Sequence, residues 1–140
     1  AGILNAGTDF NETTTPFDVG LGRFVDMDKD HFIGKEALAT APKEPRSTGL
    51  KCPTAEPLIQ GEVIIGGALA GRVTAGAFSP FLKHGTGIVL LDKPGYVAGT
   101  PLQVRCVDGA LHDGALHDLP FYDAEALIPR GKAEQIPQRA

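Results

Sequence analysis

Apolar residues in the middle of the chain fall into short runs that are separated by turn-forming residues. About six of these runs predict strands, because they are rich in Val, Ile and Leu and lack a helical period. They cover residues 49–52, 59–65, 69–75, 86–91, 102–107 and 115–119. Several short strands at this spacing are typical of a β-sandwich or a small barrel.

The turns between these strands are predicted from residue pairs that favour tight bends. Gly66-Gly67 and Asp108-Gly109 supply the positive φ that hairpin turns need, and Ser79-Pro80 is expected to end a strand. Residues 109–118 contain two tandem copies of the unit Gly-Ala-Leu-His-Asp. Two copies are too few for a solenoid, so we expect a hairpin loop that enters the final strand.

The first 44 residues mix polar turns with two regular elements. Residues 23–27 alternate polar and apolar side chains, and this period of two predicts a half-buried strand. Good helix formers follow, and we expect a short helix over residues 34–40 that ends before Pro42.

Composition and charge narrow the class of protein. Hydrophobic residues make up 42% of the 140-residue chain and charged residues 21%, which suits a folded domain. The net charge is −4 and basic residues form no run, so we expect no nucleic-acid partner and no membrane partner. No apolar run has the roughly 20 residues that span a bilayer, and the N-terminus does not resemble a signal peptide. We therefore expect a cytoplasmic protein.

Cys52 and Cys106 are the two cysteines of the chain. Two cysteines are too few for a disulfide scaffold, and each stands in a strand-like run, so we expect free and partly buried thiols. A disulfide between them would require their strands to be neighbours.

Histidines and serines form no complete catalytic or metal-binding constellation. His112 and His117 give a weak zinc signal, because no third ligand stands nearby, and a solvated hairpin is the preferred interpretation. Ser47 and Ser79 lack the Gly-x-Ser-x-Gly pattern of a nucleophile elbow.

Asp9, Glu12 and Asp18 form the most concentrated acidic group. Carboxylates can do acid–base work when their environments separate their pKa values. The alternative is that Asp9 and Glu12 organise a turn before Pro16 through hydrogen bonds to the backbone.

Several motifs, in a fixed order along the chain, indicate a particular protein family. Residues 7–22 read Gly-Thr-Asp-Phe-Asn-Glu-Thr-Thr-Thr-Pro-Phe-Asp-Val-Gly-Leu-Gly, and residues 32–38 read Phe-Ile-Gly-Lys-Glu-Ala-Leu. Residues 71–82, Gly-Arg-Val-Thr-Ala-Gly-Ala-Phe-Ser-Pro-Phe-Leu, form a second stretch, followed by Val-Ala-Gly-Thr at 97–100 and Leu-Pro-Phe-Tyr at 119–122. In order and spacing these motifs resemble the glycine-cleavage T-protein family of folate-dependent transferases.

The resemblance implies a mainly β fold, with a C-terminal barrel of about six strands preceded by a short α+β segment. It divides the chain into the end of a central folate-binding domain (1–44), the barrel (45–123) and a polar tail (124–140). The chain starts at Ala1 without a methionine. We therefore expect it to come from a longer protein, whose N-terminal folate-binding domains are its missing partner.

The resemblance also implies a function for the complete protein. Such a protein transfers an aminomethyl or methyl group from a small methylated substrate to tetrahydrofolate. The family's catalytic aspartate lies in its N-terminal third, so we expect no catalytic residue in this chain and no activity of the chain alone.

Three residues are the predicted cofactor-binding residues. Asp9 and Glu12 are expected to hold a loop that faces the folate channel, and Tyr122 is expected near its rim. The acidic turn and the strand exit at Ser79-Pro80 are expected to be two walls of one pterin-sized cavity.

The chain departs from the family pattern at three places. Ala6 replaces a tyrosine, residues 55–61 lack an arginine, and Asp123 stands where some members have a basic residue. These departures leave open a relative that acts on dimethylglycine, sarcosine or a sulfonium compound. A further alternative is a non-catalytic structural barrel of a fused folate/flavin dehydrogenase that acts on a methylated amine.

Overall fold

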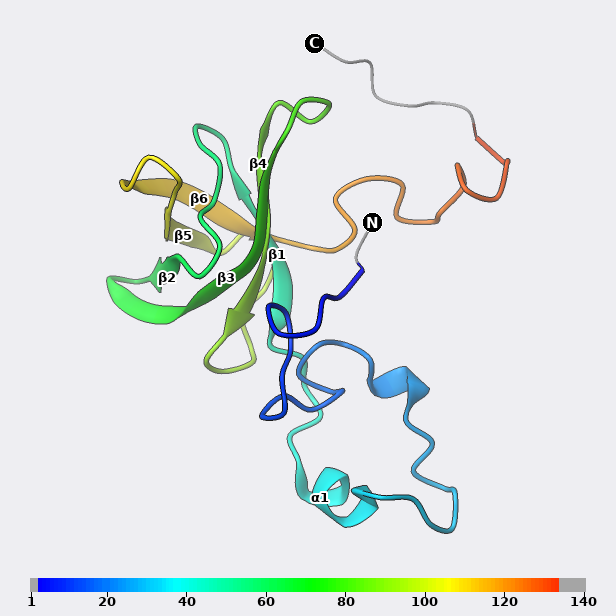
Figure 1. The fold of residues 1–140 in the computed structure, drawn as a ribbon. Coiled ribbons are helices and arrows are strands. Elements are labelled where there is room, and N and C mark those ends of the chain that lie inside the picture. Colours follow the sequence, from blue (N-terminus) through cyan, green and yellow to red (C-terminus); the bar gives the residue numbers. More distant parts are fainter. Residues whose placement is uncertain (1–2, 134–140) are drawn as a thin grey trace.

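The computed structural model describes residues 3–133, in which six antiparallel strands form a closed barrel (Figure 1). The strands are β1 (Ser47–Cys52), β2 (Glu62–Ile65), β3 (Ala68–Ser79), β4 (His84–Leu91), β5 (Pro101–Arg105) and β6 (Leu111–His117). Their order is β1-β4-β3-β2-β5-β6, and β1 closes the barrel by pairing with both β4 and β6. The predicted mainly β fold with a barrel of about six strands is confirmed.

The barrel interior is one continuous apolar core. It is built from residues that point inward from each strand, together with one residue that follows β5 directly. These are Leu50, Cys52, Val63, Val73, Val89, Leu91, Leu102, Val104, Cys106 and Leu116. The short apolar runs of the sequence therefore supply the core, because alternate side chains of a strand face the same side of the sheet.

The connection between β1 and β2 packs against the inner face of the β3–β4 hairpin. We call its residues 55–57 the strap. A Cβ atom at Gly76 would lie 2.2 Å from the carbonyl oxygen of Pro57, and one at Gly85 would lie 2.0 Å from that of Ala55. Pro57 forms an isolated bridge with Cys106, next to the end of β5. The strap can approach this closely only because glycine has no side chain.

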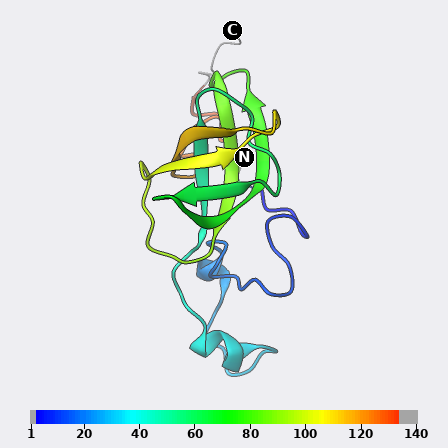
Figure 2. The ribbon, with the colours of Figure 1, turned by 90° about the vertical axis from the view of Figure 1, so that its left-hand side faces the viewer.

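The residues before β1 lie outside the barrel, at one end of it (Figures 1 and 2). They contain the 3-10 helix η1 (Gly22–Phe24) and the helix α1 (Lys35–Thr40). The predicted helix is confirmed, whereas the predicted strand over residues 23–27 is wrong. Residues 23–27 have no neighbouring strand to pair with among the described residues, and Phe24 is 70% exposed.

The tandem repeat forms a strand and not the predicted loop. Asp108 and Gly109 make the turn, and β6 then runs through both copies and pairs with β5 and β1. The repeat length of five is odd, so equivalent residues of the two copies face opposite sides of the sheet. Leu111 is 36% exposed, whereas Leu116 is 2% exposed in the core.

The predicted turns are confirmed. Gly66 and Gly67, both with positive φ, connect β2 to β3, and the Ser79-Pro80 turn follows β3. Two strands are shorter than predicted. β2 begins at Glu62 and not at Ile59, because residues 58–61 belong to the connection that carries the strap, and β5 ends at Arg105 and not at Val107.

Two glycines on the inner face of β4 provide a matched test of the close packing. We expect Gly85→Ala to lower the free energy of unfolding by about 3 kcal/mol, because its Cβ would overlap a backbone oxygen of the strap. Gly87→Ala meets its nearest atom only at 3.0 Å, so we expect a loss of about 1 kcal/mol. Urea unfolding would measure both changes, and equal losses would contradict this account of the strap.

Candidate functional site

Asp9 holds a buried carboxylate in the loop before the barrel. Its side-chain Oδ2 accepts a hydrogen bond from the backbone N–H of Asn5 at 2.8 Å, and its own N–H donates to the Asn5 carbonyl oxygen at 2.9 Å. The residue is 3% exposed, and Oδ1 has no hydrogen-bond partner among the described residues. A buried carboxylate oxygen without a donor is costly, so Oδ1 is a candidate acceptor for a ligand or another part of the protein.

Glu12 differs from Asp9 because its side chain is exposed and makes no hydrogen bond or ion pair within the described chain. The turn around it is organised by Asn11, whose side-chain oxygen accepts the N–H of Thr13 at 2.9 Å and its hydroxyl at 2.7 Å. Of the two carboxylates suggested to organise a turn before Pro16, Asp9 accepts a backbone hydrogen bond from Asn5, whereas Asn11 takes this role in the turn around Glu12.

Asp18 joins the N-terminal segment to the barrel. Its carboxylate accepts a hydrogen bond from Arg46 Nε at 2.7 Å, and its carbonyl oxygen accepts the N–H groups of Arg46 and Ser47 at 2.9 Å. Arg46 also donates to the carbonyl oxygen of Leu91 at the end of β4. Asp18 therefore has a structural role, because its carboxylate binds Arg46 and does not act together with Asp9 or Glu12.

The pKa of Asp18 reflects two opposing effects. Burial by itself would raise the pKa, but hydrogen bonds from Arg46 and Thr15 outweigh burial and hold the pKa below its usual value. The carboxylate is therefore stabilised in its charged form in the folded state.

Phe121 and Tyr122 follow β6. The Phe121 ring stacks on His117, with 5.5 Å between the ring centroids and an angle of 27° between the planes. Tyr122, the predicted rim residue, is 42% exposed.

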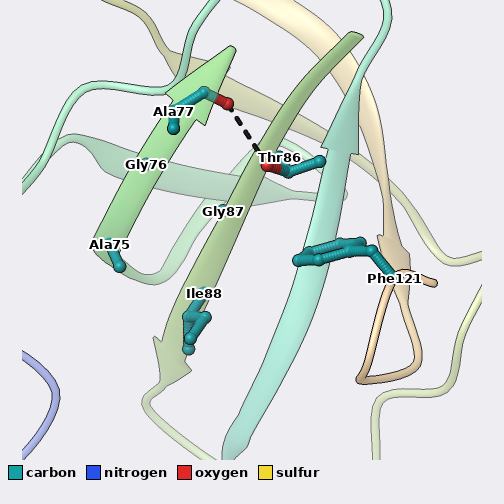
Figure 3. Close-up of a pocket in the computed structure, with 7 residues that line it drawn as sticks. All are labelled: Ala75, Gly76, Ala77, Thr86, Gly87, Ile88 and Phe121. Atoms are coloured by element: carbon teal, nitrogen blue, oxygen red, sulfur yellow. Dashed lines mark hydrogen bonds between the residues drawn. The ribbon is translucent and has the colours of Figure 1, made fainter. Parts of the chain in front are cut away.

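A shallow hollow of about 150 Å³ lies on the barrel beside Phe121 (Figure 3). Small side chains and backbone line it, namely Ala75, Gly76, Ala77, Thr86, Gly87, Ile88 and Phe121. The sequence motif ending in Phe121-Tyr122 points to this part of the chain, and of these two residues only Phe121 is among the residues that line the hollow. The stacking partner of an aromatic residue depends on the tertiary fold, so no sequence signal distinguished the two.

The predicted walls of one cavity do not meet. The Ser79-Pro80 turn lies at the far end of the β3–β4 hairpin, whereas the loop of Asp9 and Glu12 lies near the opposite end of the barrel (Figures 1 and 2). The expectation of a shared cavity is therefore wrong for the described residues. β3 continues through Phe78 to Ser79 and carries the strand exit away from the acidic loop.

A second hollow of about 260 Å³ has charged side chains among its lining residues. It is lined by Gln60, Glu62, Leu69, Gly71, Arg72 and Asp92. Glu62 accepts hydrogen bonds from Arg105, which lower the pKa of Glu62 below its usual value. The predicted cofactor-binding residues do not line this hollow either.

The two repeat histidines have separate partners. His112 Nδ1 lies 2.8 Å from the Thr54 hydroxyl and His112 Nε2 lies 2.7 Å from Asp108, which ties the β5–β6 turn to the loop after β1. His117 instead contacts Phe121. Within residues 3–133, no three His, Cys, Asp or Glu side chains are grouped so that they could hold a metal ion.

Comparison with known proteins agrees with this architecture. The family model of the glycine cleavage T-protein C-terminal barrel domain matches residues 46–123. An aminomethyltransferase of Saccharopolyspora erythraea is 36% identical over 90% of this chain and 36% of its own length. A trimethylamine-oxide aldolase of Ruegeria pomeroyi is 31% identical over 93% of this chain and 17% of its own length.

A solved structure shows the same fold. The glycine cleavage system aminomethyltransferase T of Bartonella henselae superimposes with a TM-score of 0.74 at 28% sequence identity, over 86% of this chain and 36% of that one. The fold and the motifs define an aminomethyltransferase-type C-terminal barrel domain. The chain belongs to the glycine cleavage T-protein family. It spans 36% of the length of the Saccharopolyspora erythraea and Bartonella henselae proteins and 17% of the length of the Ruegeria pomeroyi protein. None of the helices in the described part of the chain could cross a membrane.

The ion pair between Asp18 and Arg46 gives a pH-dependent prediction. We expect Asp18→Asn to lower the free energy of unfolding at pH 7 by roughly 1–3 kcal/mol, because Arg46 loses its charged partner. Since the folded-state pKa lies below the usual 3.8, the stabilisation is complete above about pH 4 and is lost as the pH falls through the folded value. Urea unfolding from pH 7 to pH 3 would show the two curves converging, and a constant difference would contradict the ion-pair account.

Proposed function

We propose that this chain is the C-terminal part of a tetrahydrofolate-dependent aminomethyl or methyl transferase and that it does not catalyse the transfer alone. The family match over the barrel carries the proposal. The relatives named aminomethyltransferase are also considerably longer than the part that this chain matches. The remainder of such a protein would supply the catalytic residue and the rest of the folate site.

The acidic loop offers hydrogen-bond acceptors that suit a pterin. Asp9 Oδ1 is buried and has no donor among the described residues, and Glu12 presents an exposed carboxylate. Pterin rings carry N–H groups, which are the complement of these oxygens. Tyr122 adds a partly exposed aromatic face. We propose that Asp9 and Glu12 bind and orient the folate, with Tyr122 at the edge of its site.

Tetrahydrofolate, when bound, supplies the nitrogen that accepts the one-carbon unit. Asp9, Glu12 and Tyr122 would fix its orientation and would not exchange a proton in the transfer. This division explains why no catalytic residue needs to be assigned to the chain.

The partner that completes the site would be the N-terminal folate-binding domains of the same protein. Large apolar side chains are exposed on the segment before the barrel, among them Ile33 at 99% and Phe24 at 70%. We propose that the missing domains cover these side chains, as contiguous exposed apolar patches are covered at domain interfaces. The acidic net charge fits a cytoplasmic protein without a nucleic-acid or membrane partner.

The one-carbon donor would be a small methylated amine or a related compound. A second candidate function follows from the relative in Ruegeria pomeroyi, which is named for trimethylamine oxide and in which the matching segment is only 17% of the protein. In that case the chain would be a structural barrel attached to domains that act on a methylated amine, as in a fused folate/flavin dehydrogenase.

Isothermal titration calorimetry with tetrahydrofolate tests the proposal on the longest natural polypeptide that contains this chain. We expect binding to that polypeptide and much weaker or no binding to the 140-residue chain. Asp9→Asn should weaken binding by about 10-fold, because it removes a charged acceptor. Glu12→Gln should weaken it less, because this carboxylate is exposed.

Asp30→Asn is the matched control, since it removes an exposed carboxylate from the same N-terminal segment. It should leave the affinity unchanged. Failure of the long polypeptide to bind tetrahydrofolate would refute the proposed function. Normal binding by both acidic-loop variants would instead favour the structural barrel.

A further inference from the structure

The two cysteines meet inside the barrel although their strands are not neighbours. Cys52 ends β1 and Cys106 follows β5, and β6 lies between these strands in the sheet. Their Sγ atoms are 3.8 Å apart, and both residues are 0% exposed. Both cysteines are free thiols in the structure, as expected, and their sulfurs are close without their strands being neighbours. Inward-pointing side chains of a small barrel meet across its interior.

We infer that Cys52 and Cys106 form a dithiol modification site that a low-molecular-weight disulfide, such as oxidised glutathione, converts into an intramolecular disulfide. One cysteine thiolate attacks the glutathione disulfide, forms a mixed disulfide and releases one glutathione. The second cysteine thiolate attacks the protein sulfur of that mixed disulfide and releases the other glutathione. Two protein thiols are oxidised, one glutathione disulfide is reduced, and the two protons pass to the leaving thiolates.

The geometry needs a small adjustment. A disulfide bond is about 2.05 Å long, so the sulfurs must approach by roughly 1.8 Å from their present contact. Both cysteines belong to the interior core cluster, and their sulfurs already contact each other directly. The two side chains must rotate to close this gap.

Burial determines when the reaction occurs. Burial, with a further contribution from the neighbouring Cys52, raises the pKa of the Cys106 thiol to about 12. Little thiolate is present at neutral pH, and glutathione disulfide cannot reach the closed interior. The first step therefore takes place while the barrel is open, and the second step closes the bond as the barrel folds.

The bond would fasten the strap as well as the core. Cys52 stands just before the strap, and Cys106 is bridged to Pro57 within it. The cysteines are 54 positions apart in sequence. Closing a loop of that length restricts the unfolded chain substantially, and we expect the melting temperature to rise by about 10 °C on oxidation.

The test compares the redox equilibrium of the two cysteines in folded and unfolded chain. The 140-residue chain is equilibrated with reduced and oxidised glutathione in buffer and in concentrated urea, starting from both redox forms, and is then acid-quenched. Mass spectrometry distinguishes the dithiol, the internal disulfide and the mixed disulfides. We expect the internal disulfide to be favoured at least about 10-fold more in buffer than in urea, because a bond that stabilises the fold is itself stabilised by folding.

Two single-cysteine variants measure how much mixed disulfide forms when no internal disulfide is possible. Cys52→Ala and Cys106→Ala should each give only mixed disulfides, and these should form in urea. Calorimetry of the oxidised and reduced natural chain provides a second measurement that does not depend on the folding of a variant. The inference would be overturned if the ratio of internal disulfide to dithiol in buffer were equal to or below that in urea. A lower melting temperature after oxidation would also overturn it. Formation of mixed disulfides or dimers alone would also overturn it.

Discussion

The closure of the barrel by β1 is the constraint on which the rest of the structure depends. β1 pairs with β4 through its whole length and with β6 on its other edge. This single six-residue strand therefore hydrogen-bonds to neighbouring strands on both of its edges and closes the sheet. Closure removes exposed sheet edges and creates the interior in which the core residues meet. The interior is narrow, and the strap fits against the β3–β4 hairpin only where Gly76 and Gly85 leave room for its backbone.

Closure also positions the segment that carries the candidate folate residues. β1 begins at Ser47, directly after Arg46, which binds Asp18 and the end of β4 at the same time. This junction attaches the preceding segment, which contains the buried Asp9 carboxylate, to one end of the barrel. The loop is fixed locally by the hydrogen bonds between Asp9 and Asn5, while Asp9 Oδ1 has no donor among the described residues.

The sequence predicted most of the fold because its signals were local. Glycine pairs and the Ser79-Pro80 pair marked the turns, apolar runs marked the strands, and ordered motifs marked the family. The errors occurred where a local pattern lacked its tertiary partner. Residues 23–27 alternate like a strand but have no strand beside them among the described residues, so a 3-10 turn forms there. The candidate site was predicted only as separate residues, because a cavity depends on distances that sequence patterns do not contain.

The tandem repeat shows where the contribution of the sequence ends. Composition and turn residues determined that the chain forms short strands around an apolar core, since these preferences act over a few residues. Identical copies of Gly-Ala-Leu-His-Asp nevertheless have different environments: Leu116 is buried while Leu111 is half-exposed, and His117 stacks on Phe121 while His112 binds Asp108. The contact between Cys52 and Cys106 likewise joins residues 54 positions apart. Only the tertiary structure decided these contacts, because they depend on which face of a closed sheet each side chain occupies.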